Sequence, residues 1–206
     1  MPEPGNEILQ CCDESGTPTF GKTRAEVHTQ PINFWHLTTG IYVVNPEGRI
    51  LCSKRSEKLN QNPGRWQMAF GGHVKYKQAP VENAVAELEE EIGLKVLPED
   101  LYYLDTRKNP NFKHFSWLYA YVFDGRRSEI KFNDGEIEKV EWYTWSEVKN
   151  DCRLIPNLRI IIPLLHTEIK GWRILDQESS VGVNCHKISV ELPIDVPFVN
   201  GEKCVN

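Results

Sequence analysis

The segment 71–94 constrains the fold more than any other part of the sequence, because glycines stand at both ends of a patterned helix. Gly71 and Gly72 precede a short polar loop. Pro80 suits the first turn of a helix and Gly93 suits the left-handed residue after its end, so the sequence predicts a helix over residues 80–91. Apolar residues recur between these ends at helical spacing and predict a stripe that faces a core: Val81, Ala84, Val85, Leu88 and Ile92.

Three glutamates share one face of this helix. Glu87, Glu90 and Glu91 stand at positions i, i+3 and i+4, which stacks their carboxylates. On a solvated face, which is the commoner setting of acidic helix residues, a like-charged pair costs about 0.2–0.5 kcal/mol. Inside a cleft the cost rises to about 3 kcal/mol per pair, at roughly 5–6 Å and an effective dielectric of about 20. If the preceding loop covers this face, a divalent cation relieves the repulsion, and oxygen-only ligands favour magnesium or manganese.

The spacing of these residues resembles the Nudix box. That family signature runs glycine, five residues, glutamate, seven residues, then Arg-Glu-aliphatic-any-Glu-Glu-any-Gly-aliphatic. Two specified positions differ here, since Gln78 stands where the family has its first glutamate and Ala86 where it has arginine. The other specified positions match at fixed spacing: Gly72, Glu87, Leu88, Glu90, Glu91, Gly93 and Leu94. The resemblance implies an α+β fold, an α/β/α sandwich around a mixed β-sheet.

The resemblance also implies a metal-dependent active site. Matched position by position, Glu87, Glu90 and Glu91 would hold Mg²⁺ or Mn²⁺. The carbonyl group of Gly72 lies where the family often adds a backbone ligand. One of the three acids, for which we choose Glu90, would orient or deprotonate the water that attacks phosphorus. The expected chemistry is therefore positioning and charge neutralisation around a diphosphate.

Residues outside the box complete the predicted site. The family often supplies one more acid from a later loop, where this chain has Asp134 and Glu136, and we choose Glu136. A basic loop carries Arg55, Lys58 and Arg65, and a related Nudix branch, that of isopentenyl diphosphate isomerase, places an arginine and a lysine here on its diphosphate. The arginine fork suits two phosphate oxygens. We expect these three residues to bind substrate, with an ordinary basic loop that balances local acids as the alternative.

We therefore predict a magnesium-dependent Nudix hydrolase that cleaves a diphosphate linkage in a nucleoside diphosphate derivative or a similar small diphosphate. Two departures keep an alternative open. The family arginine, replaced by Ala86, pairs with the box carboxylates and fixes their geometry, and Gln78 carries no charge. The alternative is a catalytically weak or inactive Nudix-fold module that binds a nucleotide or a protein.

The amino-terminal part, residues 13–66, also resembles the Nudix branch related to isopentenyl diphosphate isomerase. His28, His36 and His73 are among the residues that carry this resemblance. That branch has a cysteine directly before its Gly-His pair, where this chain has Gly71, and glycine offers no acid for proton transfer. Isomerase activity is accordingly disfavoured. We interpret His28 and His36 as hydrogen-bonded structural histidines rather than metal ligands.

Whole-chain properties narrow the partners. The net charge of −5 argues against general binding to nucleic acid or to anionic membranes. No apolar run reaches the length of a transmembrane helix and the amino terminus lacks the features of a signal peptide, so we expect a cytoplasmic protein. The six cysteines show no CxxC spacing, which indicates neither a zinc site nor a redox motif. The expected partner is a small-molecule diphosphate, and the resemblance is compatible with a homodimer.

At 206 residues the chain is expected to form one domain with additions. The Nudix domain should occupy residues 1–170, with its box at 72–94, and residues 171–206 should form a carboxy-terminal extension packed on the same domain. A polar connector is expected before residue 34, a short helix capped by Ser146, and a further helix over residues 158–169. Strands are predicted over residues 7–12, 37–44, 49–55, 66–70, 95–97, 101–106, 114–123 and 137–143.

Overall fold

The computed structural model describes residues 4–59, 62–132 and 135–150, all within the compact unit formed by residues 1–162. The described strands form one eight-stranded sheet. They are β1 (Ile8–Cys12), β2 (Pro18–Thr23), β3 (Trp35–Val44), β4 (Ile50–Arg55), β5 (Trp66–Gln67), β6 (Tyr102–Asn109), β7 (His114–Val122) and β8 (Ile137–Tyr143). The α-helices are α1 (Arg24–His28), α2 (Pro80–Ile92) and α3 (Trp145–Asn150), and short 3-10 helices span Pro4–Asn6, Pro98–Asp100 and Arg127–Glu129.

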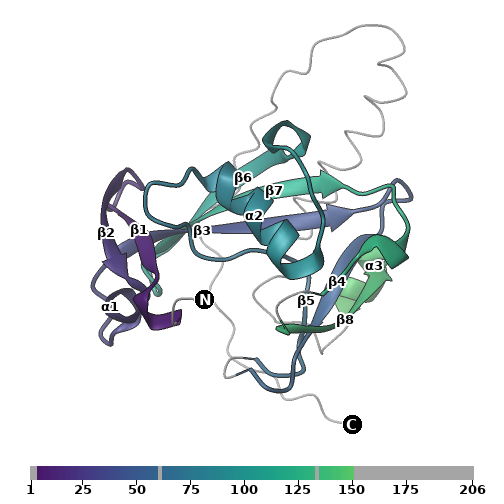
Figure 1. The fold of residues 1–206 in the computed structure, drawn as a ribbon, viewed down its shortest axis with the longest axis horizontal. Helices are drawn as coiled ribbons and strands as arrows, with labels where there is room; N and C mark the ends of the chain where they lie inside the picture. Colours follow the sequence, from purple (N-terminus) through teal and green to yellow (C-terminus); the bar gives the residue numbers. More distant parts are fainter. Residues whose placement is uncertain (1–3, 60–61, 133–134, 151–206) are drawn as a thin grey trace, which may run out of the picture. The chain divides into compact units, whose positions relative to one another are not determined.

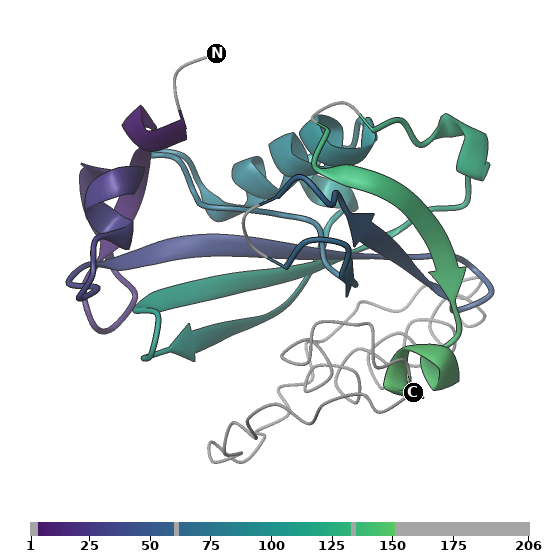
Figure 2. The same ribbon diagram turned by 90° about the horizontal axis from the view of Figure 1, so that it is seen from below.

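Strand β3 organises the sheet. It pairs in parallel with β7 along its whole length, from His36 opposite His114 to Val44 opposite Val122, and antiparallel with β1 and β4. Strand β6 pairs with β7 and β8 pairs with β4, both antiparallel, so the sheet is mixed. Figures 1 and 2 show β3 and β7 running side by side through the middle of the sheet. The predicted α+β fold class with a mixed sheet is confirmed.

Helix α2 is the predicted box helix, and its ends behave as the sequence indicates. Pro80 occupies the first turn, and Gly93 adopts a left-handed conformation with φ 70° while its N–H group donates to the carbonyl of Glu89. The apolar stripe packs on the sheet in one core: Ala84, Leu88 and Ile92 from the helix with Ile41, Val43 and Phe70 from below it. In Figure 1 the helix lies across β3. Because this stripe is buried against the sheet, the orientation of α2 about its own axis is fixed, and so is the position of its polar residues relative to β3.

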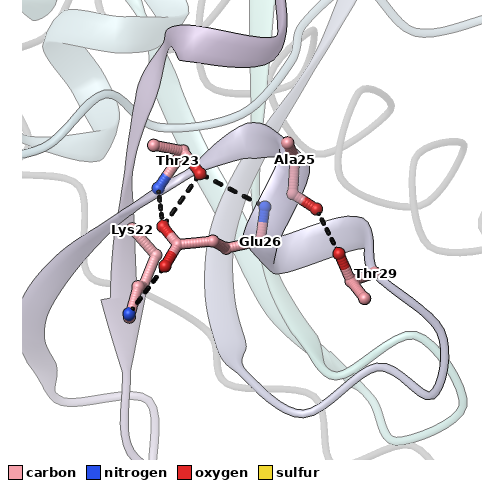
Figure 3. Close-up of polar contacts among 5 residues, drawn as sticks. All are labelled: Lys22, Thr23, Ala25, Glu26 and Thr29. Atoms are coloured by element: carbon pink, nitrogen blue, oxygen red, sulfur yellow. Dashed lines mark hydrogen bonds and ion pairs between the residues drawn. The ribbon is translucent and has the colours of Figure 1, made fainter.

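The polar connector expected before residue 34 instead contains β2 and the five-residue helix α1. Figure 3 shows why so short a helix forms: Thr23 and Glu26 make a capping box. The backbone N–H of Glu26 donates to Thr23 Oγ1 at 3.2 Å, and that of Thr23 donates to Glu26 Oε2 at 2.9 Å. Lys22 Nζ lies 2.8 Å from Glu26 Oε1. These bonds satisfy orphan donors at the helix start and position His28 at its end.

Three local predictions are wrong. Residues 95–97 form no strand, because the N–H of Leu97 donates to Asp100 Oδ2 at 2.9 Å and so begins a 3-10 helix instead of pairing with a neighbouring strand. The strand expected over 66–70 is regular only at Trp66–Gln67. Thr144, not Ser146, caps α3, since its hydroxyl accepts from the N–H of Glu147 at 3.3 Å.

The predicted helix over 158–169 and the predicted extension over 171–206 lie outside the described residues. Among the residues that are described, no helix is long and apolar enough to cross a membrane. The thiols of Cys11, Cys12 and Cys52 are buried and reduced.

Candidate functional site

The site begins where the double glycine passes under α2 and beside β3. The N–H of Thr39 donates to the carbonyl of Gly72 at 2.8 Å, which ties the loop to the central strand. Gly71 has φ 133°, and a Cβ atom there would lie 2.4 Å from the carbonyl oxygen of Thr39. A Cβ atom on Gly72 would lie 2.5 Å from Glu87 Oε1. Both glycines are therefore required by close approach, and the carboxylate of Glu87 rests directly against Gly72.

Each acid of the box has a different partner. Glu91 Oε1 accepts a hydrogen bond of 3.0 Å from the N–H of Gly71, so it too is bound to the glycine loop. Glu90 is exposed, and its Oε1 lies 3.3 Å from Lys75 Nζ. Glu87 is half-buried and lies one helical turn after Asn83, whose side chain lowers the pKa of the Glu87 carboxyl group. The three acids predicted to hold metal thus lie beside the loop that the prediction placed over them.

The charge of Glu87 is poorly solvated. Burial, together with the negative charge of Glu90, raises the pKa of its carboxyl group to about 7, while Lys75 opposes the shift. Burial destabilises the ionised form of such an acid, and a bound cation stabilises that form again by neutralising its charge. The donor atoms here are all oxygens, and because Gly72 has no side chain the Glu87 carboxylate can lie against the backbone of the loop. These residues fit a hard divalent cation of the magnesium type.

The other predicted site residues gather around the end of β4. The N–H of Arg55 donates to the carbonyl of Arg65 at 2.9 Å, and the N–H of Ser56 donates to the carbonyl of Glu136 at 2.7 Å. The N–H of Lys58 donates to Ser56 Oγ at 3.3 Å. The structure therefore brings the predicted substrate-binding residues and Glu136 together. Asp134, the other acid considered for the late loop, lies outside the described residues.

The two departures from the box have structural counterparts. Gln78 ends the loop before α2, where its N–H donates to the carbonyl of Lys75 at 3.0 Å. Its side-chain Oε1 is buried and has no hydrogen-bond partner in the described part of the chain. Ala86 is half-buried on α2, directly before Glu87. Neither position carries a charge that would restrain the box acids.

A second cluster, of histidines, lies beside the first. His28, His36 and His73 offer ring nitrogens that all lie within 4.8 Å of one another, a grouping that suits a metal ion. The Nε2 atoms of His28 and His73 are 2.9 Å apart, and the rings of His36 and His73 stack with centroids 5.3 Å apart. His114 faces His36 with ring centroids 5.7 Å apart.

The histidines are held neutral. Burial lowers the pKa of His36 to about 4 and that of His73 to about 2, and the neighbouring histidines act in the same direction. In the His28–His73 pair one neutral ring donates and the other accepts. Sequence reasoning interpreted His28 and His36 as structural histidines and assigned no role to His73, so it missed the cluster. Its only sequence signal was the set of positions shared with the isomerase pattern.

The class of protein follows from comparison with known proteins. A family model for the NUDIX domain matches residues 34–165. The chain therefore belongs to the NUDIX family, and the predicted membership is confirmed.

Two curated relatives differ in their described activities. An uncharacterized Nudix hydrolase from Clostridium acetobutylicum is 32% identical over 98 residues, which cover 46% of this chain and 46% of that protein. This chain thus spans about half the length of that relative. An isopentenyl-diphosphate Delta-isomerase from Brevibacterium linens is 29% identical over 160 residues, covering 73% of this chain and 84% of the isomerase.

Solved structures agree on the architecture. A protein from Deinococcus radiodurans superposes with a TM-score of 0.62 at 18% identity, covering 76% of this chain and 98% of that one. The NUDIX domain of NrtR from Shewanella oneidensis was solved in complex with ADP ribose. It superposes with a TM-score of 0.54 at 16% identity, and the match covers 72% of this chain and 99% of that domain. At these identities the likeness concerns the fold.

Proposed function

We propose that the protein is a magnesium- or manganese-dependent hydrolase that cleaves the diphosphate linkage of a nucleoside diphosphate derivative or a similar small diphosphate. The observation that carries this proposal is the contact between Glu87 and Gly72, with Glu91 hydrogen-bonded to Gly71. Three carboxylates on one helix face, two of them beside a glycine loop that carries no side chain, would supply the oxygen ligands of a cation site.

Glu87, Glu90, Glu91 and the carbonyl of Gly72 would hold the cation. One lone pair of that carbonyl is engaged by Thr39, which leaves the second available. When bound, a divalent ion neutralises the charge on the diphosphate and lowers the pKa of water. Glu90, the most exposed of the three acids, accepts the proton of the attacking water.

The cationic side chains of Arg55, Lys58 and Arg65 bind the phosphate oxygens in this proposal, and Glu136 supplies the late acid. Their support is the gathering of all four residues around the end of β4. Arginine pairs well with phosphate because its planar fork donates two parallel hydrogen bonds. The ADP ribose bound by the Shewanella domain makes nucleoside diphosphate sugars the first substrates to test.

Isomerase activity is the alternative suggested by the Brevibacterium relative. The backbone at Gly71 argues against it. With φ 133° and a Cβ position 2.4 Å from a backbone oxygen, this residue admits no side chain. The cysteine that the isomerase pattern places before its Gly-His pair is therefore excluded by the backbone, and proton transfer loses its acid.

A Nudix-fold module that binds without turnover is the second candidate. The observation in its favour is that Gln78 and Ala86 bring no charge to the box, and Gln78 leaves a buried oxygen without a partner. Such a module would bind a nucleotide diphosphate and release no product.

The deciding experiment is a product-release screen with the full chain. Nucleoside diphosphate sugars, dinucleoside polyphosphates, modified nucleotides and isopentenyl diphosphate are each incubated with Mg²⁺ or Mn²⁺. We expect release from at least one nucleoside diphosphate derivative, its loss in Glu90→Gln, and its retention in Glu89→Gln. Glu89 is the matched control because it pairs with Lys95 at 3.2 Å on another side of the same helix. Binding without release would establish the module, and double-bond migration would establish the isomerase.

A further inference from the structure

Asn83 is the most buried polar residue of the box helix. Its side chain is 1% exposed although asparagine is a poor helix former with two polar groups to satisfy. One amide N–H donates to Thr39 Oγ1 at 2.8 Å, and the amide lies one helical turn before Glu87, where it lowers the pKa of the Glu87 carboxyl group. Asn83 therefore connects the strand that ties down Gly72 with the acid that rests against Gly72.

The amide is satisfied on one side only. Asn83 Oδ1 is buried and, among the described residues, accepts no hydrogen bond. A buried acceptor without a partner lowers the stability of the fold, whereas an apolar side chain of similar size would not. Retaining an amide at such a position is expected where the group serves the site rather than the core.

Lys75 is the competing candidate for holding the acids. Its Nζ lies 3.3 Å from Glu90 Oε1, but the two side chains are 42% and 56% exposed. Solvent screens such a pair, and two long exposed side chains lose entropy when they are fixed in one geometry. A buried hydrogen bond to a short, rigid side chain restrains an acid more firmly. Because Asn83 is buried and Lys75 is exposed, Asn83 is the stronger candidate for restraining the box acids.

We propose that Asn83 is a positioning residue that holds the Glu87 carboxylate against Gly72 and so replaces the arginine that the box lacks at Ala86. The inference rests on the proposed function, because it assigns Glu87 to the cation site. In the metal-free protein, too, the Glu87 carboxylate should stay against Gly72 only while Asn83 is present.

The test uses Asn83→Leu, which removes the amide and fills nearly the same volume. Crystal structures of the metal-free wild type and variant report the side-chain rotamer of Glu87. Mn²⁺ affinity is measured by electron paramagnetic resonance, and kcat and KM are measured on whichever substrate the screen identifies. We expect Glu87 to leave Gly72, Mn²⁺ affinity to fall at least fivefold, and kcat to fall more than KM changes, while the melting temperature stays equal or rises.

Three companion variants separate positioning from packing. Thr39→Val removes the hydroxyl group that accepts from Asn83, so it should lower the melting temperature. Its effect on Mn²⁺ affinity should be smaller than that of Asn83→Leu. Lys77→Met is the control. Lys77 lies in the loop before α2 with its Nζ atom 5.3 Å from the centroid of the Tyr76 ring, and its replacement should change neither the melting temperature nor the Mn²⁺ affinity. Ala86→Arg added to Asn83→Leu should recover part of the lost affinity, because an arginine there supplies the missing restraint.

An unchanged Glu87 rotamer together with unchanged Mn²⁺ affinity in Asn83→Leu would overturn the inference. Equal losses in Asn83→Leu and Thr39→Val, both accompanied by lower melting temperatures, would do the same by showing a packing role. A wild type that binds no Mn²⁺ and releases no product would remove the proposed function instead. In that case the rotamer of Glu87 in the two crystal structures still decides the positioning claim.

Discussion

The acidic face of α2 and the histidine cluster meet at two adjacent residues, since Gly72 touches Glu87 and His73 contacts His28. Burial acts on both clusters, yet with opposite results. It raises the pKa of Glu87 to about 7 and lowers that of His73 to about 2, so each cluster is pushed toward its neutral form. The histidines reach neutrality and hydrogen-bond to one another.

The acidic cluster does not complete that process. Glu91 accepts a hydrogen bond from the N–H of Gly71, and Glu90 is exposed with its Oε1 3.3 Å from Lys75 Nζ. Beside them the Glu87 carboxyl group, with a pKa of about 7, is only partly neutral at pH 7. A buried cluster of titratable groups is thus either neutral and hydrogen-bonded within itself, as the histidines are, or left with charge that a counter-ion can neutralise. Only the second kind suggests ionic catalysis.

The largest effect is expected when the residual charge of the acidic cluster is removed. Glu90→Gln should lower kcat by at least about 100-fold, because it removes a metal ligand and the group assigned to take the proton. Steady-state kinetics with Mg²⁺ in excess provide the measurement. His28→Gln, in the other cluster, should retain at least a third of wild-type kcat. Similar losses in both variants would mean that the histidine cluster shares in catalysis.

A second variant tests the glycine loop that leads into Gly72 and His73, the residues at which the two clusters meet. Gly71→Ala places a Cβ atom 2.4 Å from the Thr39 carbonyl oxygen at φ 133°, so the strand must move. We expect the free energy of unfolding to fall by about 3 kcal/mol, as measured by urea denaturation. Gly135→Ala is the matched control for the conformational part, since its φ is 75° with nothing within 4 Å of the added atom. A loss no greater than that of the control would show that the loop does not approach β3 so closely.

The opposed pKa shifts predict opposed pH dependences. The folded pKa of Glu87 lies above its ordinary 4.5, so its contribution to stability is fully present below pH 4.5 and is lost as pH rises through 7. The folded pKa of His36, about 4, lies below 6.5, so stability is lost as pH falls from 6.5 toward 4. Relative to wild type, Glu87→Gln should gain roughly 2 kcal/mol between pH 5 and 8.

His36→Asn supplies the opposite arm of that experiment. Relative to wild type it should gain stability as pH falls from 6.5 to 4.5, because the unfolded wild type takes up a proton that the folded protein refuses. Urea denaturation at a series of pH values measures both differences without metal present. Parallel slopes for the two variants would contradict the contrast between the clusters.

The sequence predicts the acidic cluster far better than the histidine cluster, for a physical reason. Glu87, Glu90 and Glu91 are near neighbours on one helix, so a period of 3.6 residues suffices to bring them together. The bracketing Pro80 and Gly93 fix the ends of that helix almost to the residue. Local rules decide this part of the site.

The histidines meet through tertiary structure. His28 ends α1, His36 begins β3 and His73 follows the glycine loop, and only the sheet brings these places together. The register of β3 on β7 adds His114 opposite His36, and no short pattern encodes a parallel pairing between residues so far apart in the chain. The prediction of a strand at residues 95–97 is wrong for a related reason: the apolar pair Val96 and Leu97 could not reveal that the Asp100 side chain accepts a hydrogen bond from the Leu97 N–H.

The smallest predicted effect concerns how each cluster is supported. Helix α2 has 13 residues packed on the core, whereas α1 has five and depends on the Thr23–Glu26 capping box. Thr23→Ala should therefore cost about 1 kcal/mol of unfolding free energy, measured by urea denaturation. It should also broaden the NMR signals of His28 and His73 while those of Glu87 stay sharp. Thr29→Ala removes only a hydroxyl that donates to the Ala25 carbonyl at 2.7 Å, and should cost less. If Thr29→Ala cost as much as Thr23→Ala, the capping box would not be what holds His28 in its cluster.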